Sequence, residues 1–136
     1  MKRLYDVRDY GAVCDGTLQT ERLQAAVDAC FLNGGGEVIV PDGVFVTATL
    51  RLRSNVTLRL LSGAVLQGSA DWRDYDGFEK DALEPIAPFE DPSYAEQPLS
   101  RWSNALIRAF RAEHVRIIGE PGSVIDGVNC YDPAGE

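Results

Sequence analysis

The sequence predicts a mainly β fold in which short strands stack as the rungs of a solenoid. Five short runs rich in β-branched residues and leucine follow one another, at 38–40, 44–46, 50–52, 56–60 and 64–66. Turn residues separate the runs, as in Pro41-Asp42-Gly43, Ser54-Asn55 and Ser62-Gly63. Parallel strands joined by helices need about a dozen residues per crossover, so these short connections argue against a doubly wound sheet.

Two of the runs alternate strictly between apolar and polar residues, which is typical of strands with one buried face. Leucine alternates with arginine over residues 50–53, and aliphatic residues alternate with Thr57 and Arg59 over 56–60. A sandwich, a meander or a solenoid can satisfy this pattern. The pattern returns at 105–107, 115–118 and 123–127, and HVRIIG (114–119) resembles NVTLRL (55–60). Repetition without a helical partner favours a coil of parallel rungs, although other all-β folds stay open.

The first residues predict a strand followed by a tight loop. Leu4, Tyr5 and Val7 indicate a strand that ends at Tyr10-Gly11, and Asp15-Gly16 is a turn dipeptide. The loop has neither the GxGxxG nor the GKS/T pattern of nucleotide-binding proteins.

An amphipathic helix is predicted over residues 20–33. Thr20 is the expected N-cap, and Glu21 in the first turn suits the helix dipole. One apolar stripe runs along the helix through Leu23, Ala26, Val27, Cys30 and Phe31. Asn33 and the three following glycines end it. We expect this helix to cover the open end of the first rung.

Residues 70–104 interrupt the coil as an inserted acidic loop. The segment holds four of the seven prolines and six of the twelve aromatic residues. Disordered linkers rarely contain so many rings, so we expect an ordered loop on the flank of the coil.

Composition limits the range of functions. The chain has 136 residues, is 45% hydrophobic and carries a net charge of −8, with nine acids against three bases in 69–104. This balance argues against nucleic acid and anionic membrane partners. Neither a membrane-spanning apolar run nor a leader peptide is recognised, which predicts a cytoplasmic location.

The three cysteines predict neither a disulfide framework nor a zinc site. Cys14, Cys30 and Cys130 make an odd number with no CxxC spacing. Cys30 is expected to be a small buried apolar residue of the helix. We predict no metal and no cofactor.

Several consecutive motifs resemble those of a known family. They are YDVRDYGAVCDGT (5–17), TERLQAAVDAC (20–30), GGGEVIVPDGVFVTATLRLRSNVTLRL (34–60), SGAVLQGS (62–69) and ALIRAFRAEHVRIIGEPGSVIDG (105–127). In this order they are similar to the N-terminal part of the polygalacturonases, glycoside hydrolase family 28 of the pectate lyase-like superfamily. Cys14 in place of the usual glycine, and a loop one residue short before Thr20, depart from the family.

The resemblance implies a right-handed parallel β-helix, truncated to its first rungs, in one domain spanning 1–136. The capping helix would be 20–33, the rungs 37–68 and 105–127, and the insertion 70–104. The beginning of the chain is expected to be intact and the missing part to lie at the C-terminus.

The family's catalytic motifs are Asn-Thr-Asp, Asp-Asp, Gly-His-Gly and Arg-Ile-Lys, and none occurs here. His114 is followed by Val115, and Arg116-Ile117 continues to Ile118. Inverting hydrolysis needs an acid and a base roughly 6.5 to 9.5 Å apart. We therefore predict no catalytic residue in this chain and no activity of the chain alone.

Other acids are poor substitutes. The neighbouring carboxylates are Asp6 with Asp9, Asp71 with Asp74 and Asp76, and Glu90 with Asp91. They lie in loops or at strand ends without an apolar pocket to separate their pKa values, so we interpret them as solvated charges. Asp126 is expected to close a turn. His114 is expected to open a rung, as Asn55 does.

Substrate-binding residues stay unassigned, although two groups are candidates. Five arginines occupy outward positions where they would meet galacturonate carboxylates or simply water: Arg51, Arg53, Arg59, Arg108 and Arg116. Trp102 and Tyr94 of the insertion would stack on a sugar or pack against the coil.

Three hypotheses follow. The first is the N-terminal portion of a polygalacturonase-like hydrolase whose full-length form acts on pectin-type acidic polysaccharide or oligogalacturonide. The second is a non-catalytic module that binds acidic glycan or self-associates through its open C-terminal rung. The third, a tailspike-like structural piece, is disfavoured by the motifs SNVTL and IDG.

Overall fold

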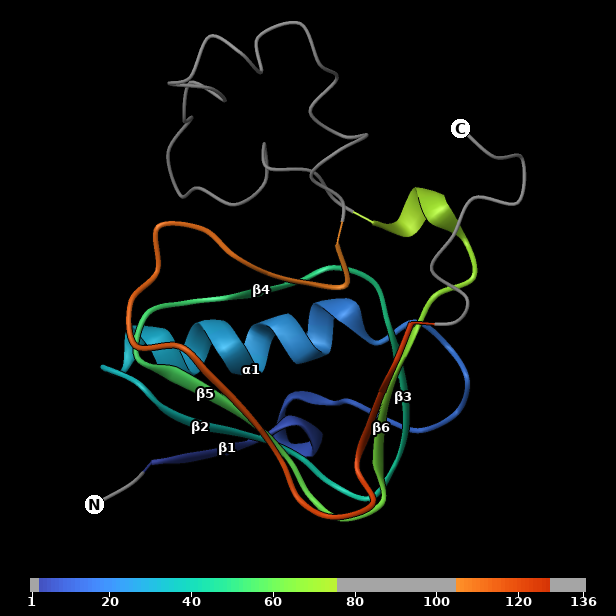
Figure 1. The fold of residues 1–136 in the computed structure, drawn as a ribbon, viewed down its shortest axis with the longest axis horizontal. Coiled ribbons are helices and arrows are strands. Elements are labelled where there is room, and N and C mark those ends of the chain that lie inside the picture. The colour runs from blue at the N-terminus through green and yellow to red at the C-terminus, as the bar shows by residue number, and fades with distance from the viewer. Residues whose placement is uncertain (1–2, 76–104, 128–136) are drawn as a thin grey trace, which may run out of the picture.

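The computed structural model describes residues 3–75 and 105–127, which form a right-handed parallel β-helix with one α-helix across its end (Figure 1). Every strand pair in this part of the chain is parallel. Parallel pairing excludes the sandwich and the meander that alternation alone had left open, and confirms the predicted fold class.

The strands form three sheets, one for each side of the coil. The first sheet contains β1 (Leu4–Asp6), β2 (Gly36–Val40), β5 (Val56–Leu60) and β8 (Arg116–Gly119). The second contains β3 (Gly43–Thr47), β6 (Ala64–Gly68) and β9 (Val124–Asp126), and the third β4 (Leu50–Leu52) and β7 (Ile107–Ala109). A short 3-10 helix, η2 (Trp72–Asp74), follows β6.

The register shows how the insertion fits. Val38 pairs with Leu58, one rung later, after only a short stretch of chain. Leu50 pairs with Ile107, although residues 70–104 lie between them in the sequence. The insertion therefore enters between β6 and β7 without shifting the stack.

The core consists of aliphatic side chains from successive rungs that lie above one another. Inward positions alternate with outward ones, so that Leu58 and Leu60 are buried while Thr57 and Arg59 face outward. The largest buried side chains include Phe45, Leu23, Leu50, Leu58, Leu60 and Leu66. Burying one such aliphatic side chain contributes about 1.5–3 kcal/mol.

The corner between the first and second sheets repeats the same turn on two rungs. The N–H of Ala64 donates to the carbonyl of Leu61 (2.9 Å), and the N–H of Ser123 donates to the carbonyl of Glu120 (3.0 Å). The third residue of each turn is glycine, Gly63 or Gly122, with φ of 83° and 86°. Such positive φ angles favour glycine, which explains its recurrence at this corner.

Helix α1 (Thr20–Leu32) lies across the end of the first rung (Figure 1). Its predicted apolar side is buried, as Leu23, Ala26, Val27 and Cys30 show. Thr20 is not the N-cap, however. Gln19 holds that position, and the Thr20 hydroxyl accepts a hydrogen bond from the N–H of Ala48 (2.7 Å).

The edge of the first rung next to the helix is hydrogen-bonded on all three sides. Strand β1 pairs with β2, and the N–H of Gln19 donates to the carbonyl of Val46 (2.8 Å). On the third side the Gln24 amide accepts from the N–H of Arg51 (2.8 Å) and donates to its carbonyl (2.9 Å). The Gln24 side chain thus makes the hydrogen bonds that a neighbouring strand would otherwise make to this edge of β4.

The opposite end of the described coil is uncovered. Strands β8 and β9 have a neighbour on one side only within the described ranges. Ile117, Val124 and Ile125 are each almost half exposed, at 48%, 47% and 44%.

The first strand is shorter than predicted. It ends at Asp6, and the 3-10 helix η1 (Val7–Tyr10) follows. Asp6 is the N-cap of this helix, because its carboxylate accepts a hydrogen bond from the N–H of Arg8 (2.9 Å). Val7, the first residue of the helix, is fully buried.

Candidate functional site

Arg59 forms an ion pair within the first sheet, so its charge is already neutralised by a neighbouring carboxylate. Its Nε and Nη2 each lie 3.0 Å from a carboxylate oxygen of Glu37 on the neighbouring strand. Both side chains are largely buried, with 24% and 10% of their surface exposed. The bidentate hydrogen bond to Glu37 raises the pKa of Arg59. Its contribution is therefore to hold β2 against β5.

Arg53 fixes the helix to the coil. Its Nε lies 3.2 Å from the Asp28 carboxylate of α1, which also accepts from Nε2 of Gln24 (3.0 Å). This pair has a structural role as well.

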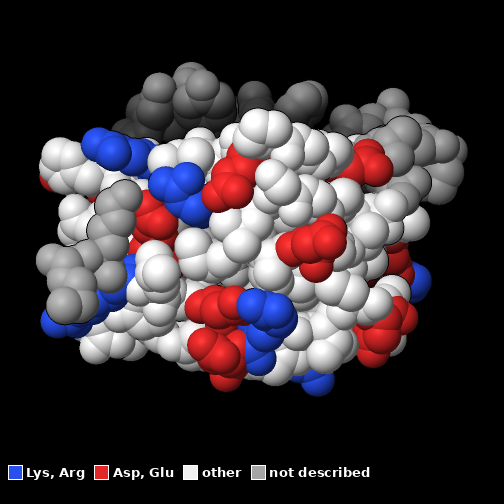
Figure 2. All heavy atoms as spheres, turned by 90° about the horizontal axis from the view of Figure 1, so that it is seen from below, with Lys and Arg blue, Asp and Glu red and all other residues white. Residues whose placement is uncertain are grey.

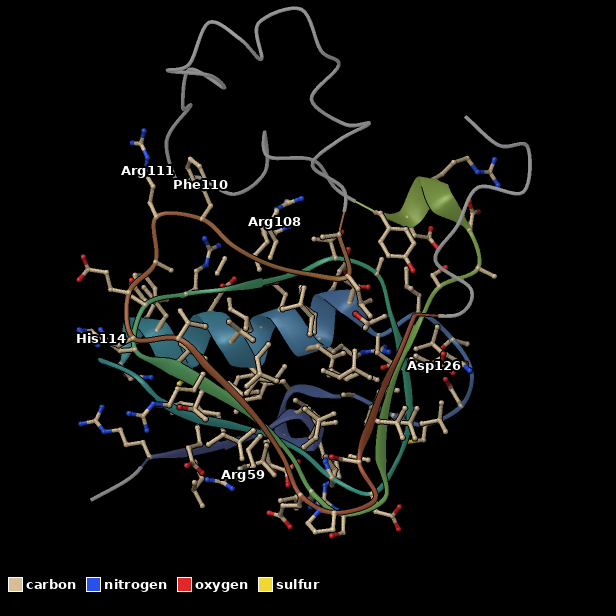
Figure 3. The ribbon with its side chains drawn as sticks, viewed as in Figure 1. Arg59, Arg108, Phe110, Arg111, His114 and Asp126 are labelled. Carbon is tan, nitrogen blue, oxygen red and sulfur yellow. The ribbon has the colours of Figure 1, made fainter. Side chains whose placement is uncertain are left out.

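Arg51 and Arg108 are adjacent on the outer side of the third sheet. The register places them opposite each other on β4 and β7, where neighbouring strands lie about 4.8 Å apart. Arg108 is only 7% exposed, and both arginines have contacts within the protein. Arg108 projects away from the core (Figure 3).

Arg116 differs from the other four arginines. It lies on the outer side of β8 beside Thr57 and is exposed. Within residues 3–75 and 105–127 it forms no ion pair. Arg116 is thus the one candidate of the five that combines exposure with an unpaired charge in the described ranges.

Asp6 and Asp71 lack the raised pKa that a general acid requires. Arg8 hydrogen-bonds Asp6 and lowers the pKa of that carboxyl, and Arg73 lowers the pKa of Asp71 in the same way. Asp74 accepts from the Ser69 hydroxyl (2.5 Å). A general acid requires a raised pKa, so the lowered pKa values of Asp6 and Asp71 support the interpretation of these two groups as local surface charges.

His114 and Asp126 lie on opposite sides of the coil (Figure 3). His114 is exposed and precedes β8, with φ of 57°, as expected of a residue that opens a rung. Asp126 is the last residue of β9 and pairs with Gln67 of β6, whereas the sequence had predicted a turn there. The two side chains therefore cannot act on one bond.

Some candidates fall outside the described residues, namely Asp76, Glu90, Asp91, Tyr94 and Trp102. Among the residues that are described, no three His, Cys, Asp or Glu side chains gather as metal ligands would. No helix in the same ranges is long and apolar enough to cross a membrane.

Sequence reasoning missed one pair in the turn after β7, an exposed arginine beside a half-buried aromatic ring. The guanidinium carbon of Arg111 lies 5.3 Å from the centroid of the Phe110 ring. Arg111 is exposed and has a positive φ of 50°. The available signal was an aromatic residue followed directly by arginine, outside any alternating run. Figure 3 shows both side chains on the outer side of the coil with Arg108.

Acidic and basic groups are interspersed on the face of the molecule shown in Figure 2. Acidic side chains are spread over this face between uncharged residues, and basic side chains lie among them. No extended patch of a single sign is visible on it.

The chain is similar to a galacturonosidase and to exopolygalacturonases. It is 46% identical over 126 residues to the exo-poly-alpha-D-galacturonosidase of Dickeya chrysanthemi, a match covering 92% of this chain and 19% of the relative. The family 28 exopolygalacturonase of Yersinia enterocolitica superposes with a TM-score of 0.65 and 29% identity, over 88% of this chain and 20% of that one. The hyperthermoactive exopolygalacturonase of Thermotoga maritima superposes with a TM-score of 0.68 and 25% identity, over 94% of this chain and 26% of that one.

No protein-family profile matches the chain. The chain spans about a fifth of the length of the Dickeya relative. Similarity thus extends over most of this chain and over a minor part of each larger protein.

Proposed function

We propose that this chain is part of a family 28 polygalacturonase, a hydrolase that acts on pectin-type polygalacturonate. The observation that carries the proposal is the 46% identity to a galacturonosidase across 92% of the chain. The shared β-helix supports it, because stacked rungs hold outward side chains in fixed rows along each sheet.

The reaction we propose for the whole enzyme is inverting acid/base hydrolysis, with its catalytic aspartates outside this chain. One carboxylic acid protonates the leaving oxygen while a second carboxylate activates water on the opposite side of the sugar. The lowered pKa values of Asp6 and Asp71 support a non-catalytic role for this part. Its contribution would be to close one end of the coil and to start the register that later rungs follow.

Reducing-end release from polygalacturonate tests this proposal. The 136-residue chain is expected to release no product, and a protein extended with the downstream rungs of a relative is expected to release galacturonate. Proton NMR of the first product then distinguishes inversion from retention. Turnover by the 136-residue chain alone would contradict the assignment of catalysis to residues outside it.

A second candidate function is self-association through the uncovered rung. The half-exposed Ile117, Val124 and Ile125, with the one-sided strands β8 and β9, favour it, because an open edge pairs readily with another strand. The proposed partner is a second copy of this chain. Sedimentation should show a dimer that Ile125→Lys abolishes.

Val44→Lys is the matched control for this test, since Val44 is equally exposed, at 43%, but lies on β3 away from the open rung. A wild-type monomer at all concentrations would exclude self-association.

A cytoplasmic location is also proposed, supported by the free thiols of Cys14 and Cys30. Cell fractionation tests it.

A further inference from the structure

We propose that Asn33, at the C-terminal end of α1, is a site of spontaneous deamidation that the folded end of the helix holds back. The chain contains four asparagines, and Asn33 is the one that glycine follows. In this reaction the backbone nitrogen of the next residue attacks the side-chain amide carbon, and a side chain on that next residue hinders the attack. Glycine has no side chain and moves freely in φ and ψ, so Asn33-Gly34 is the most reactive asparagine pair of the sequence.

The reaction consumes only water and needs only base. The deprotonated nitrogen of Gly34 forms a bond to Cγ of Asn33, the bond from Cγ to Nδ2 breaks, and ammonia leaves with a proton taken from water. Water then opens the five-membered imide at either carbonyl, which gives aspartate or isoaspartate. In total, one amide and one water become one carboxylate and one ammonium ion. Asn33 and Gly34 are both exposed, so water and base can reach the pair.

The backbone of the folded chain keeps the reacting atoms apart. Closure of the imide ring requires the Gly34 nitrogen to lie on the same side of the Cα–C bond as Cβ of Asn33. Asn33 has φ of −93° and ψ of 14°. A ψ near zero places the Gly34 nitrogen beside the backbone nitrogen of Asn33 and away from its Cβ. The ring cannot close until this torsion turns.

Two hydrogen bonds oppose that rotation. The N–H of Gly34, whose nitrogen must attack, donates to the carbonyl of Phe31 (3.0 Å). Nδ2 of Asn33 donates to the carbonyl of Ala29 (2.9 Å), which holds the side-chain amide over the last turn of the helix. Helix ends open locally at a fraction of the free energy of global unfolding. Deamidation of the native protein therefore proceeds from molecules in which the last turn of α1 has opened.

Deamidation weakens the attachment of α1 to the coil. A carboxylate at residue 33 cannot donate to Ala29, and it adds negative charge at the negative end of the helix dipole. Isoaspartate also inserts an additional carbon into the backbone between Asn33 and Gly34. The carbonyl of Asn33 accepts a hydrogen bond from Nη1 of Arg3 (2.6 Å), next to the first strand, and the longer backbone displaces this contact. The modified end of α1 should therefore open more readily.

Incubation of the 136-residue chain at mildly alkaline pH, with and without urea, tests the proposal through ammonia release and peptide mass spectrometry. In urea, Asn33 should convert first of the four asparagines. Without urea its conversion should be slower by about tenfold or more, because opening the last turn costs two hydrogen bonds. Arg3→Ala should raise the native rate several-fold and leave the rate in urea unchanged. Arg116→Ala, which removes an exposed arginine of β8, is the matched control and should change neither rate.

The deamidated chain, separated by ion exchange, should unfold at a lower urea concentration than the untreated chain. Asn33→Asp should reproduce the part of this loss that comes from charge. Faster conversion of Asn55, which precedes valine, would overturn the assignment to Asn33. Equal rates with and without urea would overturn the protection by the helix end, as would equal native rates for Arg3→Ala and Arg116→Ala. If Arg3→Ala does not fold, the comparison of the wild type with and without urea decides.

Discussion

Asn55 and His114 occupy the same position on successive rungs, and both have a left-handed backbone, with φ of 66° and 57°. Each residue immediately precedes the segment that continues into a strand of the first sheet. Gly35, with φ of 103°, holds the equivalent position one rung earlier. The coil therefore has a left-handed residue at this corner before each of β2, β5 and β8. Glycine adopts that conformation freely, and asparagine is among the few other residues that adopt it routinely, because its short polar side chain can hydrogen-bond locally.

His114→Asn is expected to stabilise the protein by a few tenths to about 1 kcal/mol, because asparagine tolerates positive φ better than histidine does. His114→Val should be destabilising by about 1 kcal/mol or more, because a β-branched side chain fits this region poorly. Urea unfolding followed by circular dichroism measures both changes. Glu113→Asn is the control, since Glu113 has an ordinary φ, and it should leave the midpoint nearly unchanged. Equal effects of the two asparagine variants would contradict the explanation.

Gly35→Ala should be far more damaging than Gly34→Ala. Both glycines have positive φ, at 103° and 92°, so each alanine carries a conformational cost of about 1 kcal/mol. A Cβ on Gly35 would also lie 2.7 Å from the Cβ of Asn55, whereas a Cβ on Gly34 would meet nothing within 4 Å. We expect a loss of at least about 3 kcal/mol for Gly35→Ala. Similar unfolding midpoints for the two variants would exclude the steric explanation.

Gln24→Met should destabilise the chain by about 2–4 kcal/mol. Methionine keeps the length of the side chain but leaves the N–H and the carbonyl of Arg51 without their hydrogen bonds, and each unpaired buried group is costly. Thermal and urea unfolding measure the loss. Glu21→Gln, an exposed change in the same helix, should cost only a few tenths of a kcal/mol. If Gln24→Met matches this control, β4 does not depend on Gln24.

Stability should fall in alkali because of Cys30. Burial raises the pKa of its thiol from 9.0 to about 11, so the folded state keeps the proton longer than the unfolded state does. The stabilisation by the neutral thiol is complete below pH 9.0 and is lost as the pH rises toward about 11. Urea midpoints across this range should decline more steeply for the wild type than for Cys30→Ala.

The same thiol should be unreactive in the native protein. In a Cys14→Ser, Cys130→Ser variant, Cys30 is the only cysteine, and it is fully buried. A thiol reagent at pH 8 should label it only after addition of urea. Rapid native labelling would contradict its position in the core.

The sequence predicted the coil well because its main determinants are local. Alternation over 50–53 and 56–60 identified the inward leucines, and the similarity of 114–119 to 55–60 identified His114 as the counterpart of Asn55. Alternation cannot distinguish parallel from antiparallel pairing, because both leave the same residues inward. The resemblance to a family favoured parallel pairing, and the strand pairs of the structure confirm it.

The candidate site was less predictable because its properties depend on contacts between rungs. Outward positions were identified correctly for Arg53 and Arg59, but their partners Asp28 and Glu37 lie more than twenty residues away in the sequence. Only the register brings each pair together. Arg111 was missed because it lies in a turn, outside any alternating run.

Residues 3–32 cover one end of the coil and precede in the sequence the strands that they cover. These residues leave the ribosome before the rung that they cover, and once β2, Val46 and Arg51 have bonded to them, further backbone can add only at the other side of the rung. Each new turn of chain thus meets a finished template instead of searching among alternatives. We therefore expect the coil to assemble from this end during translation, with helix α1 and Gln24 in the place of a preceding strand.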